Sequence, residues 1–145
     1  MIIQSPTPEI KKSLDFYKKL KFNILEQDDE TLVSDGKVLI KINPERYARP
    51  GIILYNKNWS SKIEEVRKLV PVFETGSSYI VTDSTGSWIY LLNGEVPSYS
   101  IKGECHSTLG NYAGMSFETI SMSHSRSLWE IFGYKVTMGG PDEGW

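Results

Sequence analysis

Side chains suited to catalysis or metal binding are scarce in this chain. One cysteine and two histidines occur among its 145 residues: Cys105, His106 and His124. A thiolate beside an imidazole can act as a reactive pair or as half of a metal site. Adjacent residues of an extended chain point to opposite sides, however, and no second Cys or His lies at ligand spacing. We therefore interpret Cys105 and His106 as incidental residues of a connecting segment.

Two other groups near the end of the sequence could also support chemistry. His124 could join Glu118 in binding a metal, but a polar residue at the start of an expected helix is the simpler interpretation. Gly139-Gly140-Pro141 opens no helix with Lys-Ser or Lys-Thr, so it lacks the pattern of a phosphate-binding loop. Both histidines lie in the last third of the sequence, so no Ser-His-Asp catalytic arrangement is expected within residues 1–96.

Composition excludes several classes of partner. A net charge of -2 gives no electrostatic basis for binding nucleic acid or an anionic membrane. No apolar run is long enough to cross a bilayer, and the first residues lack the basic start of a signal peptide. A single cysteine is typical of a reducing compartment. We expect a cytoplasmic protein whose partner is a small molecule.

The first forty-odd residues predict a strand, a helix and three further strands. Thr7 is suited to be the N-cap and Pro8 the first residue of the helix, in which apolar residues form one stripe and lysines the opposite face. The three strands are expected at Phe22–Gln27, Thr31–Ser34 and Lys37–Asn43. Asp35-Gly36 is a strong hairpin signal between the last two.

The same order of elements then repeats. A strand at Gly51–Asn56 precedes a helix with an apolar stripe, and three strands follow at Val72–Glu74, Ser78–Thr82 and Ser87–Leu92. Lys41 in the first half and Tyr90 in the second therefore occupy equivalent places, near the middle of each half's last strand.

A third copy begins near Ala113 but is incomplete. Met115–Ser121 is predicted to be a strand, Ser123–Phe132 a helix and Tyr134–Met138 a second strand, so two more strands would be needed. We divide the chain into a domain at 1–96, a Ser- and Gly-rich linker at 97–112, and the start of a second similar domain at 113–145.

Two stretches resemble a known family. Ser13-Leu14-Asp15-Phe16-Tyr17, with Leu20-Lys21-Phe22 after it, is similar to a helix motif "Ser-aliphatic-x-Phe-Tyr" followed by a Leu-Gly-Phe turn, with Lys21 in place of the usual Gly. Asp83-Ser84-Thr85-Gly86-Ser87-Trp88-Ile89-Tyr90-Leu91 is similar to "Asp-Pro-x-Gly-Asn-x-Ile-Glu-Leu". Both motifs are those of the vicinal oxygen chelate superfamily, which includes glyoxalase I, bleomycin-resistance proteins and extradiol dioxygenases. The resemblance covers residues 1 to about 96.

The resemblance implies an α+β fold in which paired βαβββ modules form an open half-barrel sheet of the glyoxalase/bleomycin-resistance type. Enzymes of the family hold a divalent metal in the concavity with His and Glu from the first and last strands of each module. Here Lys41 and Tyr90 stand where the acids would, and the first strands offer no His, Asp or Glu. A lysine ammonium would also repel a cation. We therefore expect no metal and no other cofactor.

Strand alternation gives a candidate ligand-binding set. If Val38, Ile40, Ile42, Ile89 and Leu91 face the helices, the inward-facing residues are Leu39, Lys41, Trp88 and Tyr90. Aromatic walls with a few polar groups are typical of small-molecule pockets, so we expect a planar ligand, with an anionic group near Lys41 as one option. The competing interpretation is that these side chains only fill the cavity or pack against a neighbouring subunit.

An enzyme split across two domains is the alternative function. The chain would then be the non-catalytic N-terminal part of a metal-dependent lyase or dioxygenase, with activity in residues beyond this sequence. The apolar residues after Ala113 need cover in either case, so we expect them to dock on the first domain and to favour a homo-oligomer, such as a dimer, through exposed strand edges.

Overall fold

The structure is a computed structural model that describes residues 1–27, 29–99, 107–110 and 112–139. Its strands are β1 (Ile2–Pro6), β2 (Asn23–Gln27), β3 (Glu30–Ser34), β4 (Leu39–Asn43), β5 (Gly51–Asn56), β6 (Val72–Thr75), β7 (Ser78–Thr82) and β8 (Trp88–Asn93). Its helices are α1 (Ile10–Lys19), η1 (Trp59–Ser61, a 3-10 turn), α2 (Ile63–Arg67) and α3 (Met122–Ile131). Among the described helices none is both long and apolar enough to cross a membrane.

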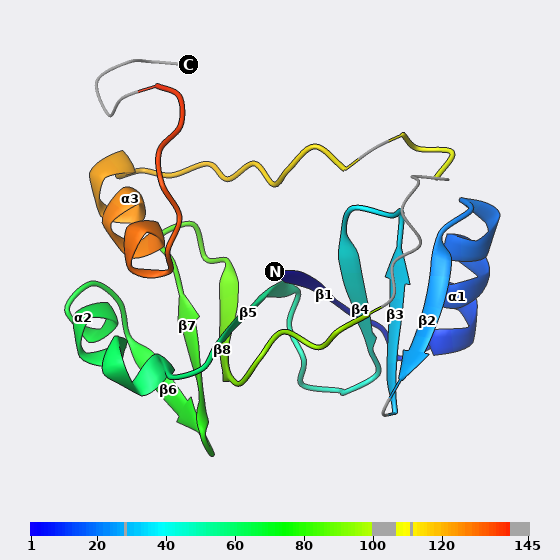
Figure 1. Ribbon diagram of the computed structural model, residues 1–145, viewed down its shortest axis with the longest axis horizontal. Helices are drawn as coiled ribbons and strands as arrows, with labels where there is room; N and C mark the ends of the chain where they lie inside the picture. Colours follow the sequence, from blue (N-terminus) through cyan, green and yellow to red (C-terminus); the bar gives the residue numbers. More distant parts are fainter. Residues whose placement is uncertain (28, 100–106, 111, 140–145) are drawn as a thin grey trace.

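The eight strands form one open sheet in the order β2-β3-β4-β1-β5-β8-β7-β6. Within each half the first strand runs parallel to the last, β1 beside β4 and β5 beside β8, while the intervening pairs are antiparallel hairpins. The halves meet where β1 pairs antiparallel with β5 (Figure 1). The predicted α+β fold of paired βαβββ modules is therefore confirmed.

The ends of α1 differ in how well the sequence predicts them. The predicted N-cap at Thr7 is wrong: α1 begins at Ile10, and its N-cap residue is Glu9, whose side chain makes no capping hydrogen bond. The Thr7 hydroxyl accepts a hydrogen bond from the Glu9 N–H at 3.2 Å, in the turn that precedes the helix. At the other end Lys21 has φ of 62°, and the N–H groups of Lys21 and Phe22 bond back to the carbonyls of Lys18 and Tyr17. This left-handed cap is the position at which the family motif has glycine, because glycine adopts that conformation without strain.

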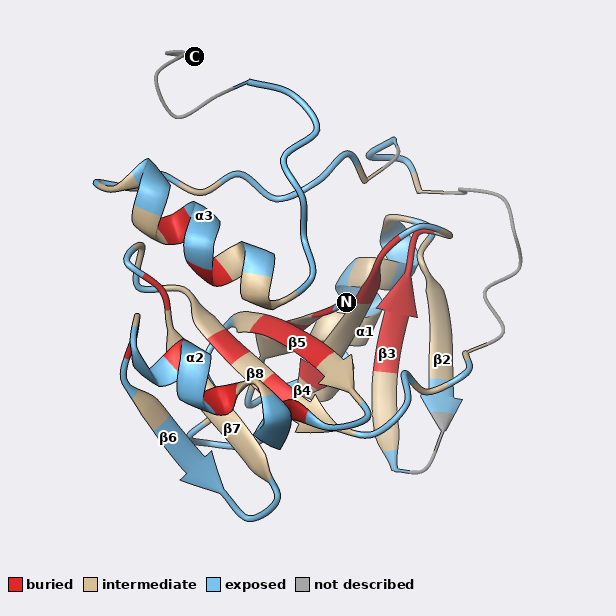
Figure 2. Ribbon diagram, turned by 60° about the vertical axis from the view of Figure 1, so that its left-hand side comes forward, coloured by how far each residue is buried: buried red, intermediate tan, exposed pale blue. Residues whose placement is uncertain are grey.

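The main hydrophobic core lies under α2 and α3. Its buried residues come from β5, β7 and β8, from the helices above them and from the turn after α2: Ile52, Leu54, Trp59, Ile63, Val66, Val70, Val81, Ile89, Leu91 and Leu128. Figure 2 shows these buried positions along β5 and β8 and on the inner sides of α2 and α3. By contrast, α1 contains no buried residue. The second module is therefore covered by two helices, one of which comes from beyond residue 112.

The segment after residue 112 differs from the prediction in one respect. The expected strands at Met115–Ser121 and Tyr134–Met138 are not formed, and α3 is the only regular element described there. A strand requires a hydrogen-bonded neighbour, and this segment has no ladder partner. It instead crosses from the first module to the second, as Figure 1 shows. The Tyr112 N–H donates to Asp35 Oδ2 at 3.0 Å at one end of this crossing.

Candidate functional site

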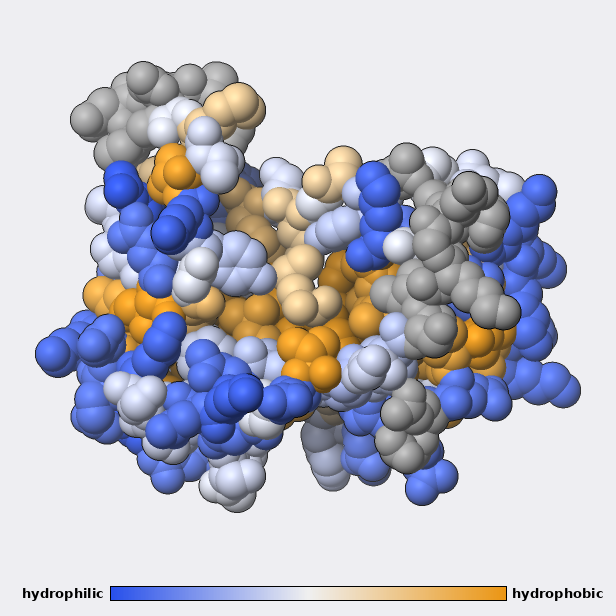
Figure 3. Space-filling view, in the orientation of Figure 1, coloured by the Kyte–Doolittle hydropathy of each residue, from blue (hydrophilic) through white to orange (hydrophobic). Residues whose placement is uncertain are grey.

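The two faces of the sheet carry different sets of side chains. Ile89 and Leu91 of β8 belong to the core beneath the helices. Tyr90 and Leu92 of the same strand pack with Ile53 in a second cluster on the opposite, helix-free face. Figure 3 shows hydrophobic residues in a band across the middle of the molecule, flanked by hydrophilic residues over the outer elements. We call the helix-free face the concave face.

A cavity of about 320 Å³ lies on the concave face where the two modules meet. The lining residues come from β1, β4, β5, β7, β8 and the loop between β4 and β5: Gln4, Lys41, Asn43, Glu45, Tyr47, Ala48, Ile53, Ile80, Trp88, Tyr90 and Leu92. Three of the four residues selected from sequence, Lys41, Trp88 and Tyr90, are therefore in its wall. We call it the concave-face cavity.

Leu39 differs from the expectation. It is 9% exposed and packs with Ile2, Leu32 and Ile53 rather than lining the concave-face cavity. Tyr55 and Tyr99 pack against the same cluster. These side chains cover this part of the concave face, so Leu39 is a core residue although it points to the expected side.

The charge of Lys41 is already paired. Its ammonium contacts Glu30 Oε1 in an ion pair whose side chains are 21% and 32% exposed. The Tyr99 hydroxyl donates to the other carboxylate oxygen of Glu30 at 3.2 Å. A ligand anion would have to displace or share the Glu30 carboxylate, because Lys41 offers no unpaired charge to the cavity.

The aromatic wall is held in place by the loop between β4 and β5. The Tyr90 hydroxyl donates to the Arg49 carbonyl at 3.0 Å and accepts from the Arg49 N–H at 3.1 Å. The Gln4 amide also donates to that carbonyl at 3.0 Å. Trp88 and Tyr90 have ring centroids 6.4 Å apart and an interplanar angle of 33°. The wall therefore presents aromatic surface, and its phenol is used internally.

Neither side chain at the positions where the resemblance places acidic metal ligands is such a ligand. Lys41 is an ammonium group paired with Glu30, and the Tyr90 phenol is hydrogen-bonded to the backbone of Arg49. Within the described ranges no three His, Cys, Asp or Glu side chains come together as metal ligands, a survey that includes His124 and Glu118. Cys105 and His106, interpreted above as incidental, lie outside the described residues.

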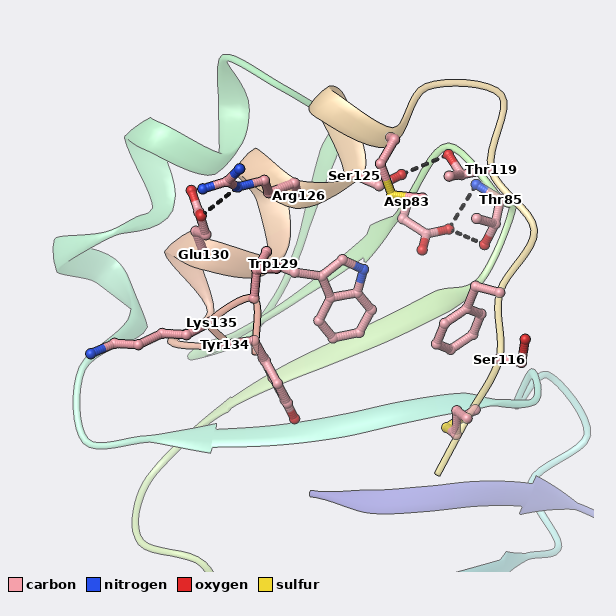
Figure 4. A pocket seen from close by; sticks show the side chains of 14 residues that line it. Asp83, Thr85, Ser116, Thr119, Ser125, Arg126, Trp129, Glu130, Tyr134 and Lys135 are labelled. Carbon is pink, nitrogen blue, oxygen red and sulfur yellow. Dashed lines mark hydrogen bonds and ion pairs between the residues drawn. The ribbon is translucent and has the colours of Figure 1, made fainter. Parts of the chain in front are cut away.

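A second, larger cavity was not anticipated from sequence. It has a volume of about 620 Å³ and lies between α3, the segments flanking it and the turn that joins β7 to β8 (Figure 4). Its lining residues are Asp83, Thr85, Met115, Ser116, Phe117, Thr119, Met122, Ser125, Arg126, Trp129, Glu130, Tyr134, Lys135 and Val136. The sequence did not indicate it because its walls come from two segments about thirty residues apart, Asp83–Thr85 and Met115–Val136, which only tertiary packing brings together. We call it the α3 cavity.

Comparison with known proteins gives similarity at the level of solved structures alone. No family model matches the chain, and no curated protein matches it. TioX from Micromonospora sp. ML1 is 10% identical with a TM-score of 0.30, covering 68% of this chain and 98% of its own. A bleomycin-binding protein from Streptomyces verticillus is 15% identical with a TM-score of 0.29, covering 66% and 95%. The fosfomycin resistance protein FosX from Mesorhizobium loti is 14% identical with a TM-score of 0.30, covering 66% and 91%.

The strand order of this chain is by itself that of two paired βαβββ modules, the arrangement expected from the sequence. The cavities of this chain are the basis for its proposed ligand.

Proposed function

We propose that the protein binds a small planar molecule in the concave-face cavity without a metal ion. The observation that carries the proposal is that Lys41, Trp88 and Tyr90, from equivalent strands of the two modules, line one cavity. Its volume of about 320 Å³ is at the lower end of the range of small-molecule sites. This supports a compact ligand of one or two rings.

The wall chemistry favours an uncharged ligand over an anionic one. Trp88 and Tyr90 supply aromatic surface against which a flat ring gains stacking and burial. The ion pair of Lys41 with Glu30 carries no net charge, and an anionic ligand would have to displace the Glu30 carboxylate or share Lys41 with it. Gln4 and Asn43, which share a hydrogen bond of 3.0 Å, place polar groups at one side of the cavity.

A thermal-shift screen tests the proposal, because any ligand that binds the folded state raises apparent stability. The probes are indole, coumarin and 2-naphthol as neutral planar molecules, with 2-naphthoate as the matched anion. We expect at least one neutral probe to raise the melting temperature. Trp88→Leu should weaken its affinity by about twofold to tenfold, the range for loss of an aromatic contact.

Phe16→Leu is the matched control, because Phe16 is an exposed aromatic residue on α1, away from the cavity. It should leave the affinity unchanged. Binding that is equally strong in Trp88→Leu would refute the concave-face site, as would a consistent preference for 2-naphthoate over its neutral analogues. Elemental analysis after gel filtration should find well below one equivalent of any transition metal; about one equivalent would refute the metal-free part of the proposal.

A further inference from the structure

One end of the α3 cavity contains a carboxylate with an unused acceptor. Asp83 is 6% exposed, and its Oδ1 accepts hydrogen bonds from the N–H groups of Thr85 and Ser87 at 2.9 and 3.0 Å. Its Oδ2 is buried and has no hydrogen-bond partner among the described residues. Burying a carboxylate oxygen without a hydrogen-bond donor is unfavourable. A ligand that brings a donor to this end of the cavity would therefore be stabilised by a hydrogen bond to Oδ2.

The equivalent carboxylate in the first module shows what kind of donor fits. Asp35 is the first residue after β3, as Asp83 is the first residue after β7. Asp35 Oδ1 accepts from the N–H groups of Lys37 and Val38 at 2.8 Å, two and three residues on, and Asp83 Oδ1 likewise accepts from two N–H groups of its own turn, two and four residues on. Its Oδ2, however, accepts the N–H of Tyr112 at 3.0 Å, a donor from outside the module. By this comparison, Asp83 Oδ2 lacks an external N–H.

The rest of the α3 cavity is aromatic and adaptable. The rings of Phe117 and Trp129 are stacked with centroids 5.9 Å apart, and Tyr134 meets Trp129 edge-on at 5.2 Å. Figure 4 shows the Trp129 ring extending into the space beside Asp83. Met115 and Met122 complete the apolar lining, and their unbranched side chains change conformation at little cost. Such movement would let a bound group reach the shielded Oδ2 atom.

The other charged residues of the lining do not neutralise Asp83. Arg126 and Glu130 form an ion pair with each other at 2.8 Å. Figure 4 shows Lys135 extending away from the Asp83 end of the cavity. The hydroxyls of Ser125 and Thr119 lie 2.7 Å apart and bond to each other rather than to the carboxylate. The inner end therefore carries one unpaired negative charge beside an aromatic surface.

We propose that the α3 cavity is a second ligand site, for a small molecule that joins a planar aromatic ring to a protonated amine. The ring lies against Trp129, and the ammonium group donates to Asp83 Oδ2. The site is separate from the concave-face cavity: the two share no lining residue. Either proposal can therefore fail without the other.

Three matched probes test the ligand class: 1-naphthylmethylamine, 1-naphthylmethanol and 1-naphthylacetate. They share a ring system and differ in the charge of the attached group. Calorimetry on the full chain should show the order amine, alcohol, carboxylate, with the amine about tenfold tighter than the alcohol, as expected for a hydrogen bond to a charged group. In proton–nitrogen correlation spectra the amine should shift the Trp129 indole N–H signal, assigned as the one missing in Trp129→Phe.

Asp83→Asn should lower the affinity for the amine about tenfold and leave that for the alcohol nearly unchanged. An asparagine oxygen can still accept hydrogen bonds from the two N–H groups of the turn, so we expect this variant to fold. Asp35→Asn is the matched control, because that carboxylate has the same turn role but lies outside the cavity lining. Trp88→Leu should also leave amine binding unchanged, which separates this site from the concave-face cavity.

Several results would overturn the proposal. The first is that the carboxylate binds as tightly as the amine, and the second is that Asp83→Asn leaves the affinity for the amine unchanged. The third is that the amine shifts other indole signals but not that of Trp129. The fourth is that the amine does not bind at any concentration up to its solubility limit. If Asp83→Asn does not fold, the order of the three probes on the unaltered chain and the Trp129 signal still decide the outcome.

Discussion

Replacing Leu128 by alanine tests whether α3 belongs to the same cooperative unit as the sheet. Leu128 is fully buried and lies in one cluster with Trp59, Ile63 and Val66 of the second module. If α3 is part of that core, truncating the Leu128 side chain must destabilise strands that are far away in sequence. If α3 only rests on the surface, the change will unfold the helix and leave the sheet as it was.

The magnitude follows from the burial of this side chain. Leu128→Ala removes three buried carbon atoms, which costs about 2.4 kcal/mol at about 0.8 kcal/mol per CH2 group. A residual cavity of about 60 Å³ at about 24 cal/mol per Å³ adds about 1.4 kcal/mol. We therefore expect the free energy of unfolding to fall by about 3 to 4 kcal/mol.

Urea denaturation followed by circular dichroism and by tryptophan fluorescence measures the effect. Both signals should move together to a lower midpoint in a single transition. Leu109→Ala is the control, since Leu109 is 70% exposed and its truncation should change stability by no more than about 0.5 kcal/mol. An early helical transition with unchanged hydrogen-exchange protection in β8, or a midpoint equal to that of Leu109→Ala, would refute the reasoning.

Two further changes test the turns and the pairing of the sheet. Burial raises the pKa of Asp35, but hydrogen bonds from backbone N–H groups, those of Val38, Lys37 and Tyr112 among them, together outweigh it, so the pKa is lowered. Its carboxylate then stabilises the fold above about pH 4, and this contribution disappears as pH falls through the folded-state pKa. Asp35→Asn should thus cost about 1 to 3 kcal/mol near neutral pH and progressively less in acid; a pH-independent difference in urea midpoints would contradict this. A Cβ at Gly51 would lie 2.3 Å from the Trp88 carbonyl oxygen of the paired strand, so Gly51→Ala should lower the free energy of unfolding by about 1 to 3 kcal/mol in the same assay. Thr75→Ala, on the exposed edge strand, is the control and should have a smaller effect. Equal urea midpoints for the two variants would contradict the close approach of Gly51 to Trp88.

Local patterns were sufficient to predict the strands of residues 1–96, whereas the single helix expected after β5 is a 3-10 turn, η1, followed by the short helix α2. Each strand lies within a residue or two of its predicted range, because alternation and turn residues such as Asp35-Gly36 act within a few positions. Alternation also assigned Ile89 and Leu91 to the helix side of β8. These inferences needed no knowledge of which strands are neighbours.

Features that depend on distant partners could not be predicted in this way. Met115–Ser121 has the composition of a strand, but whether it forms one depends on whether a free strand edge is available for pairing. Phe117 instead stacks on Trp129, which the sequence does not indicate. The pairing of Lys41 with Glu30 is likewise tertiary: the residue opposite Lys41 in the ladder is Leu32. The expected anion-binding role of Lys41 overlooked that neighbour.

The joint between the modules has a kinetic consequence. The meanders β2-β3-β4 and β6-β7-β8 pair strands that are close in sequence, whereas β1 pairs with β4 and β5 across loops of more than thirty residues. Long-range pairings close large loops and form late, so we expect β1 to be added to meanders that are already assembled. Pairing between β1 and β5 involves only Ile2–Gln4 and Gly51–Ile53. We therefore expect the concave-face cavity, which lies across the β1–β5 pairing, to acquire its shape last during folding of the sheet.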